Sequence, residues 1–180
     1  MIPAADRAII VVEPMTKRHL KAVRAIDAKV YPRPWSLAMY LQELANGSNR
    51  VYRIVRSAGK VVGYGGLMVV GSDGHVTSVA TDPDHRSIGV GSRALLALVR
   101  GALDSACEAL TLEVRVSNID AQRMYGRFGF ERAGVRKGYY TDNREDAVVM
   151  WANDIGGSAF RSRMRDIEAS FDHHTEWRSS

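Results

Sequence analysis

The sequence has one cysteine, Cys107, among its 180 residues. A single thiol excludes an intrachain disulfide and leaves no cysteine pair for a zinc site. We therefore expect neither a disulfide framework nor a structural metal. This cysteine usage is typical of proteins that fold in a reducing compartment, so we expect the protein to be cytoplasmic.

Long apolar runs are also missing from the sequence. No uncharged apolar stretch approaches the roughly 20 residues that a membrane-spanning helix needs. Residues 1–7 lack the basic start and the apolar run of a signal peptide. We therefore expect no membrane span and no secretion leader.

The composition is that of a globular protein with a modest basic excess. Hydrophobic residues make up 46% of the chain and charged residues 25%, which argues against a disordered chain. One domain is the default at this length. The net charge of +5 favours an anionic partner such as nucleic acid, a membrane surface or a phosphorylated cofactor. A solvated surface with a slight arginine excess explains the same charge.

Hydrophobic periodicity and turn residues predict an alternating series of strands and helices. The predicted strands span residues 8–12, 51–56, 61–70, 75–81, 109–116, 130–136 and 147–152. The predicted helices span residues 20–28, 37–45, 90–106 and 121–128. A strand, a helix and a strand at the centre of this order favour a parallel crossover within a mostly antiparallel sheet. The predicted fold class is therefore α/β with a mixed sheet.

The last part of the chain differs from the rest. We place the domain at residues 1–155 and a separate tail at residues 156–180. Gly156-Gly157-Ser158 is a flexible joint, and the tail has four arginines against four acidic residues, so the net charge belongs to the domain. Terminal segments are often poorly ordered. The sequence therefore predicts a flexible tail, to which we assign no role.

The most informative segment is the turn between the predicted strand 75–81 and the helix that begins near Gly91. It reads Arg86-x-x-Gly89-x-Gly91. Glycines let the backbone approach a ligand closely, and a helix N-terminus presents free N–H groups with a partial positive charge. These features together predict a pyrophosphate site, to which Arg86 and Arg93 add charge.

Two better-known phosphate motifs do not fit this turn. It lacks the Gly-Lys-Ser/Thr ending of a Walker loop, and its glycine spacing is not that of the dinucleotide fingerprint. From the residues alone, a loop with two glycines for tight turning and no ligand is the remaining alternative.

The same turn resembles motif A of the GNAT N-acetyltransferases, in which it holds the pyrophosphate of acetyl-CoA. The stretch Leu112-Glu113-Val114-Arg115-Val116-Ser117-Asn118 resembles the next strand of that family, and the stretch from Ala121 to Phe130 resembles its motif B. The resemblance covers roughly residues 8–153. It implies the GNAT fold, a twisted sheet with helices on both faces, and acetyl-CoA as cosubstrate without a metal. The cofactor-binding residues implied by the turn and the resemblance are Val79, Ala80, Thr81, Arg86, Ser87, Ile88, Gly89, Val90, Gly91, Ser92, Asn118 and Tyr125.

Acetyl transfer to an amine needs a base, a stabilised carbonyl oxygen and a proton donor for the departing thiolate. Glu113 is the candidate base, since it stands in an otherwise apolar strand where partial burial would favour proton uptake. The alternative is an edge-strand carboxylate paired with Arg115 or Arg132. Tyr125 is the candidate acid, with simple core packing as its alternative. The resemblance supports both residues, because the family's ribosomal N-terminal acetyltransferases carry a base in the same Leu-Glu-Val-Arg context and a tyrosine that points at the CoA sulfur.

Further contacts to the cofactor come from the backbone and from one amide side chain. Asn118 can cap the helix that follows it and also bond the pantetheine arm. The backbone of residues 79–81 would pair with pantetheine as an added strand, and one N–H there could polarise the thioester carbonyl. Cys107 need not be a nucleophile, because direct attack requires no covalent intermediate.

Two segments bear on the substrate. The stretch from Tyr31 to Ser36 resembles the Phe/Tyr-Pro-x-Trp-Ser stretch of the N-terminal alanine acetyltransferases, with one extra residue before Trp35. The stretch 136–147 resembles the same group's Arg-x-x-Tyr-Tyr … Glu-Asp-Ala turn. The predicted substrate-binding residues are Tyr31, Trp35, Tyr139 and Tyr140. They would wall a narrow slot that suits a chain end, with ordinary hairpin packing as the alternative for the tyrosine pair.

The sequence thus predicts a cytoplasmic N-terminal protein acetyltransferase that moves an acetyl group from acetyl-CoA to an α-amine by direct attack. The substrate is expected to begin with alanine or another small residue, and a ribosomal protein is one candidate. A lysine or small-amine acetyltransferase is the enzyme alternative. A non-catalytic acyl-CoA-binding or ribosome-binding module is the alternative of another class. We expect no direct contact with nucleic acid or membrane, and either a monomer or a weak dimer.

Overall fold

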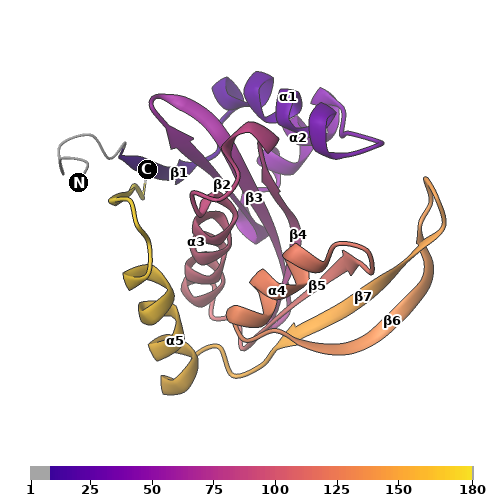
Figure 1. The fold of residues 1–180 in the computed structure, drawn as a ribbon, viewed down its shortest axis with the longest axis vertical. Helices are drawn as coiled ribbons and strands as arrows, with labels where there is room; N and C mark the ends of the chain where they lie inside the picture. The colour runs from indigo at the N-terminus through magenta and orange to yellow at the C-terminus, as the bar shows by residue number, and fades with distance from the viewer. Residues whose placement is uncertain (1–8, 180) are drawn as a thin grey trace.

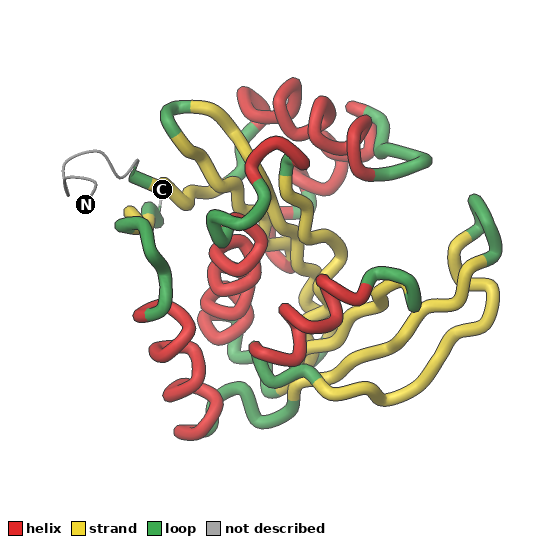
Figure 2. Tube along the Cα trace, in the orientation of Figure 1, coloured by secondary structure: helices red, strands yellow, loops and turns green. Residues whose placement is uncertain are grey.

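The computed structural model describes residues 9–179. In that range the strands form one sheet with the order β6-β7-β5-β4-β3-β2-β1-β8 (Figure 1). The strands are β1 (Ile10–Pro14), β2 (Arg50–Ser57), β3 (Lys60–Val70), β4 (Asp73–Thr81), β5 (Ala109–Arg115), β6 (Glu131–Tyr140), β7 (Glu145–Ala152) and β8 (Thr175–Trp177). The helices are α1 (Leu20–Val30), α2 (Leu37–Ala45), α3 (Val90–Asp104), α4 (Ile119–Arg127) and α5 (Ser158–Ala169) (Figure 2). Residue 8 of the first predicted strand and the stretch 1–7 lie outside the described range.

Every predicted strand and helix is present, and most of their ends are shifted by no more than a residue or two. α2 begins at Leu37 and ends at Ala45, as the sequence predicts. Its start is fixed by Ser36, whose hydroxyl oxygen accepts a hydrogen bond from the Met39 N–H at 3.2 Å. The largest shift within the sheet is in β6, which continues to Tyr140 and so carries the paired strands beyond the sheet as a long hairpin with β7 (Figure 1).

The sheet is mixed, and its parallel pairs decide where the site lies. Pairing is antiparallel except between β4 and β5 and between β1 and β8. The β4–β5 contact joins only residues 73–75 to residues 109–111. Beyond it, β4 stays with β3 up to Thr81, and β5 stays with β7 up to Arg115. The predicted α/β fold with a central parallel crossover is therefore confirmed, and its two middle strands separate toward their carboxyl ends.

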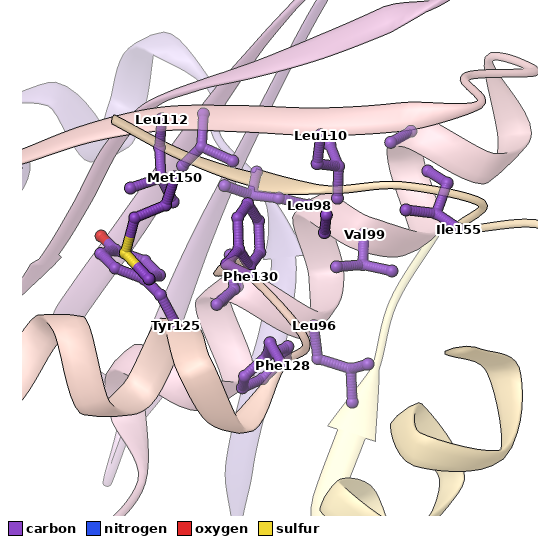
Figure 3. Close-up of a cluster of buried hydrophobic side chains, with 14 of the residues drawn as sticks. Leu96, Leu98, Val99, Leu110, Leu112, Tyr125, Phe128, Phe130, Met150 and Ile155 are labelled. Atoms are coloured by element: carbon purple, nitrogen blue, oxygen red, sulfur yellow. The ribbon is translucent and has the colours of Figure 1, made fainter. Parts of the chain in front are cut away.

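Helices cover both faces of the sheet, because consecutive strand residues point to opposite sides. On β2, Ile54 packs in a cluster with α1 and α2, and the next residue, Val55, packs with residues of α3. The larger core cluster lies between α3, α4, α5 and the sheet, where Figure 3 shows Leu96, Leu98, Phe128, Phe130 and Met150. No helix within residues 9–179 is long and apolar enough to cross a bilayer.

Residues 156–180, for which the sequence predicts a flexible tail, instead contribute a helix and a strand to the fold. Phe160, Met164 and Ile167 recur at helical spacing on α5, and each side chain is at most 7% exposed in the main core cluster. β8 then pairs in parallel with β1 at the edge of the sheet (Figure 1). The positive and negative charges of this segment balance, and the prediction of a flexible tail does not take its helical stripe of apolar residues into account. That stripe packs α5 against the core.

Candidate active site

The separation of β4 from β5 opens a cavity of about 1160 Å³. Its walls come from the α1–α2 loop, β4, the turn before α3, β5, α4 and the β6–β7 turn. The predicted site residues that line it are Tyr31, Trp35, Val79, Ala80, Thr81, Arg86, Ser87, Gly89, Val90, Gly91, Ser92, Glu113, Asn118, Tyr125, Tyr139 and Tyr140. Segments far apart in the sequence therefore meet in one place.

Ile88 is the predicted site residue that does not line the cavity. Its side chain packs with the Val90 cluster on α3, and its carbonyl oxygen accepts a hydrogen bond from Arg93 at 2.7 Å. Arg93 also differs from the sequence-based expectation that it adds charge to the phosphate site. It is 1% exposed and does not line the cavity.

The turn before α3 has the backbone shape of an anion site. Ser87 and Gly89 have φ values of +71° and +74°, in the left-handed region. Gly89 is the N-cap of α3, and no side chain there accepts a hydrogen bond from the first turn. The free N–H groups at the start of this helix therefore remain available on the stretch that lines the cavity, Gly89 to Ser92.

Gly91 sits where the turn approaches two neighbouring elements. A Cβ at this position would lie 3.3 Å from the Met124 sulfur on α4 and 3.4 Å from the Thr81 hydroxyl oxygen on β4. The glycine thus lets the ends of β4, α3 and α4 converge on the cavity. Asn118 starts α4 at this point, and its side-chain oxygen accepts a hydrogen bond from the Ala121 N–H at 3.1 Å, the cap that the sequence predicts.

Glu113 lies on β5 with a side chain that is 10% exposed. Its Oε2 lies 2.6 Å from Nε2 of His75 on β4, and its Oε1 lies 3.4 Å from Nη2 of Arg136 on β6. The alternative for Glu113 is an edge-strand carboxylate paired with Arg115 or Arg132. β5 is instead an inner strand between β4 and β7, and the arginine that pairs with Glu113 is Arg136. The carboxylate is therefore held at both oxygens while it lines the cavity.

Tyr125 on α4 is 7% exposed, and its ring packs against Phe130 with centroids 5.8 Å apart (Figure 3). Burial raises the pKa of this phenol above its usual value. The hydroxyl is therefore protonated at neutral pH and can act as a hydrogen-bond or proton donor. Tyr125 both packs in the core and lines the cavity, so the two interpretations of this residue are compatible.

The β6–β7 turn is fixed by an ionic cluster around Arg115. Its guanidinium lies 2.8 Å from Asp142 and 3.1 Å from Glu145, and it stacks 3.9 Å from the centroid of the Tyr140 ring. Hydrogen bonds from the Ser117 hydroxyl and N–H, helped by Arg115, lower the pKa of Glu145 to about 2. Tyr139 packs edge-to-face on Tyr140 with centroids 5.2 Å apart.

The two predicted substrate loops contact each other. Arg33 Nη1 of the α1–α2 loop donates a hydrogen bond to the Thr141 hydroxyl of the β6–β7 turn at 3.4 Å. On the loop itself, the Trp35 ring packs against Tyr40 with centroids 5.3 Å apart. Tyr31 ends α1 and is 37% exposed beside the cavity.

Sequence reasoning missed a buried carboxyl group at this end of the cavity. Asp27 on α1 is 1% exposed, accepts a hydrogen bond from the Tyr40 hydroxyl at 2.5 Å, and accepts another from the Tyr64 hydroxyl. Burial raises the pKa of Asp27. A signal was present, because Asp27 falls on the apolar stripe of α1 with Val23 and Ile26.

The other missed residues are the partners of Glu113. His75 and Arg136 could have been found only from the pairing of β4 and β6 with their neighbours. Within residues 9–179, no group of three or more His, Cys, Asp or Glu side chains is placed to hold a metal ion.

A family profile described as the acetyltransferase (GNAT) family matches residues 20–130. The chain belongs to this family. It is a GNAT N-acetyltransferase, as the sequence predicts, and GNAT enzymes use acetyl-CoA as acyl donor.

Two curated relatives of this GNAT chain are named as alanine N-acetyltransferases of ribosomal protein bS18. A Bacillus subtilis (strain 168) protein, provisionally named a [ribosomal protein bS18]-alanine N-acetyltransferase, is 36% identical over 129 residues, which is 72% of this chain and 85% of the relative. The Escherichia coli (strain K12) protein of that name is 31% identical over 133 residues, 73% of this chain and 88% of the relative. The crystal structure of the ribosomal-protein-S18-alanine N-acetyltransferase from Escherichia coli matches with a TM-score of 0.72 and 28% identity, covering 81% of this chain and 94% of that one.

Proposed function

We propose that this enzyme acetylates the α-amine of a protein N-terminus. The observation that carries the proposal is the contact between the two substrate loops, Arg33 to Thr141 at 3.4 Å, at one end of the cavity. Two loops that meet across the cavity leave space for one chain segment that ends at the reacting amine. An internal lysine is flanked by chain on both sides, and both flanking segments would collide with these loops.

The relatives support the same class of substrate. Those from Bacillus subtilis and Escherichia coli are named for the alanine of ribosomal protein bS18. For this chain we propose a first residue that is small, such as alanine, and a ribosomal protein as a candidate substrate. The aromatic side chains of Tyr31, Tyr139 and Tyr140 supply rigid walls for the first residues of such a peptide.

Acetyl-CoA supplies the activated acyl group, and we place it along β4 and the turn before α3. Residues 76–81 of β4 bond β3 on one side and have no β5 partner on the other. Their free backbone groups can therefore bond pantetheine as an added strand. The free N–H groups of residues 89–92 and the Arg86 side chain suit the pyrophosphate.

The catalytic roles follow from the same placement. Glu113, directly or through a water, takes the proton that the α-ammonium must lose before attack. A backbone N–H of residues 79–81 stabilises the carbonyl oxygen as negative charge develops there. Tyr125, protonated at neutral pH, gives its proton to the departing thiolate, and the second proton that the attacking nitrogen loses as the amide forms restores the phenol. An α-amine suits this arrangement, because its pKa of about 8 lies roughly two and a half units below that of lysine.

The test is a competition within one peptide. A peptide with an alanine α-amine and an internal lysine is incubated with acetyl-CoA, and fragmentation locates the acetyl group. The proposal predicts acetylation at the α-amine, and a matched peptide with a blocked N-terminus should stay unmodified. Predominant acetylation of the lysine would favour the lysine or small-amine alternative. The absence of turnover on a panel of N-terminal hexapeptides, together with tight CoA binding, would contradict the assignment of a protein N-terminus as substrate.

A further inference from the structure

Arg93 is a buried cation in the first turn of α3, directly behind the turn to which we assign the pyrophosphate. A buried guanidinium needs partners for its N–H groups, since an unsatisfied buried charge is costly. Two of these bonds go to the turn. Arg93 Nη1 donates to the Ile88 carbonyl at 2.7 Å and to the Gly89 carbonyl at 3.2 Å.

The remaining contacts of Arg93 come from the end of the chain. Its Nε donates to the Thr175 hydroxyl at 2.7 Å, and its Nη2 donates to the His173 carbonyl at 2.9 Å. The guanidinium also lies over the Phe171 ring, 4.1 Å from the centroid. One side chain therefore joins the phosphate turn to the segment for which the sequence predicts a flexible tail.

The bond to Ile88 fixes the direction of one peptide group, and the Gly89 carbonyl, which also accepts the Arg93 N–H at 3.1 Å, is fixed by α3 as well. A trans peptide is planar, and its C=O and the following N–H point in opposite directions. With the Ile88 and Gly89 carbonyls turned toward Arg93, the N–H groups of Gly89 and Val90 point away from it. Gly89 and Val90 both line the cavity, where these N–H groups would meet an anion.

The C-terminal segment is itself anchored at several points besides Arg93. Glu168 pairs with Arg100 at 2.6 Å, and Arg100 stacks on the Trp177 ring at 4.1 Å from its centroid. Arg93 and Arg100 are two turns apart on one face of α3. One face of α5 packs in the main core, and β8 is paired with β1 (Figure 1). The segment thus presents Phe171, His173 and Thr175 to Arg93 from a fixed position.

We propose that residues 158–177, named here the C-terminal strap, hold the phosphate turn in its anion-binding conformation through Arg93. Phe171, His173 and Thr175 are then positioning residues for acetyl-CoA, although none of them lines the cavity. This inference rests on the proposed placement of the pyrophosphate at residues 86–92. Loss of the strap's contacts frees the turn to adopt other conformations, so the cofactor must select the competent one and binds more weakly.

The test measures coenzyme A binding by calorimetry and acetyl-CoA kinetics in strap variants of the full chain. Thr175→Val removes one hydrogen bond with little change of volume, and Phe171→Leu removes the ring under the guanidinium. We expect the double variant to weaken the Kd for coenzyme A about tenfold and to raise the KM for acetyl-CoA with little change in kcat.

The matched control is Cys107→Ala, which removes a buried core side chain outside the strap and outside the cavity lining. It should lower thermal stability and leave the Kd unchanged. Coupling is also reciprocal, so coenzyme A should slow amide hydrogen exchange at residues 171–177 in the native protein.

The outcomes separate this inference from the proposed site. An unchanged Kd in the Phe171→Leu/Thr175→Val variant, or an equal loss in Cys107→Ala, overturns the strap's role. Normal coenzyme A binding after bulky replacement of Gly89 and Gly91 would overturn the placement of the pyrophosphate itself, and the strap's role with it. If the glycine variant loses binding and the strap variant does not, only the strap's role is wrong.

Discussion

Glu113 and His75 stand side by side on neighbouring parallel strands, with Oε2 of the carboxylate 2.6 Å from Nε2 of the imidazole. Arg136 approaches the other carboxylate oxygen at 3.4 Å. Glu113 is therefore held from two sides, by groups on β4 and β6, in one orientation at the cavity wall. The proposed base is thereby held in a single orientation, in which it can meet an incoming amine without reorganisation.

We expect Glu113→Gln to lower kcat by about 10²-fold or more, the usual range for removal of a general base. Glutamine keeps the shape and the hydrogen bond to His75 but cannot take a proton. The KM for acetyl-CoA should change little, because Glu113 lies on β5 and not on the phosphate turn. Steady-state kinetics with an alanine-initiated peptide check this, with circular dichroism as the control for folding.

Tyr125→Phe should also lower kcat, because phenylalanine keeps the packing on Phe130 and removes the proton donor. The affinity for the peptide, measured with a non-reactive CoA analogue present, should stay near that of the wild type. If turnover is unchanged in Tyr125→Phe and in Glu113→Gln, both residues are structural and the assigned chemistry is wrong.

Replacement of His75 tests whether this residue acts by orienting the Glu113 carboxylate. His75→Leu removes the partner of Oε2, and we expect kcat to fall roughly tenfold, since small displacements of a catalytic group are costly. His75→Gln can still donate a hydrogen bond and should retain most of the activity. In the Glu113→Gln background, His75→Leu should have no further effect. An additional loss there would show that His75 acts independently of Glu113.

The phosphate turn makes a prediction about ligand-induced stability. Acetyl-CoA should raise the melting temperature of the wild type by mass action, because it binds only the folded state. Gly89→Val with Gly91→Val should abolish the rise, since Gly89 has a φ of +74° and its Cβ would lie 2.7 Å from Arg93 Nη1. Gly134→Val on β6, where a Cβ meets nothing within 4 Å, is the matched control and should keep the full shift.

Asp27 gives a prediction about pH. Burial raises its pKa above that of the unfolded chain, so the folded state holds this proton more tightly. Its contribution to the free energy of unfolding is therefore largest at low pH and falls as pH rises through the folded-state pKa. The amide side chain in the Asp27→Asn variant does not titrate. The free energy of unfolding of the wild type should therefore exceed that of this variant by less at pH 7 than at pH 4.5.

Urea unfolding of both proteins at the two pH values measures this difference. Asp120→Asn, at a side chain that is 98% exposed, is the control and should show a nearly constant difference from the wild type. If the difference in free energy of unfolding between the wild type and Asp27→Asn is constant or larger at pH 7, the raised pKa assigned to Asp27 is wrong.

The parts of the site that could be predicted from sequence are those governed by local rules. A serine before an apolar run predicts the start of α2, and glycines ahead of an apolar helical run predict the turn before α3, because each depends on residues within one turn of chain. Glu113 could be singled out for a related reason. A single acidic residue among apolar strand neighbours stands out without knowledge of the partner strands.

The parts that could not be predicted depend on pairing between distant segments. His75 reaches Glu113 because three residues of β4 pair with three of β5 before the strands separate, and no local pattern reveals where that pairing stops. Arg93 was expected to face the anion, and its true direction is set by Phe171 and Thr175, about 80 residues further along the chain. The helical spacing of Phe160, Met164 and Ile167 can be recognised in the sequence, but the prediction for this segment rests on its balanced charges instead.

The parallel pairing of β8 with β1 also bears on association between molecules. Without β8, the five residues of β1 would form an open edge, and unpaired backbone groups of that kind template contact with another chain. β8 covers Ile10, Val11 and Val12 with three residues of its own, which include a glutamate, so the new edge is short and charged. At the opposite end, β6 presents Arg132, Arg136 and Lys137. β8 thus shortens the exposed border at the β1 side of the sheet, which protects the folded protein against edge-to-edge aggregation.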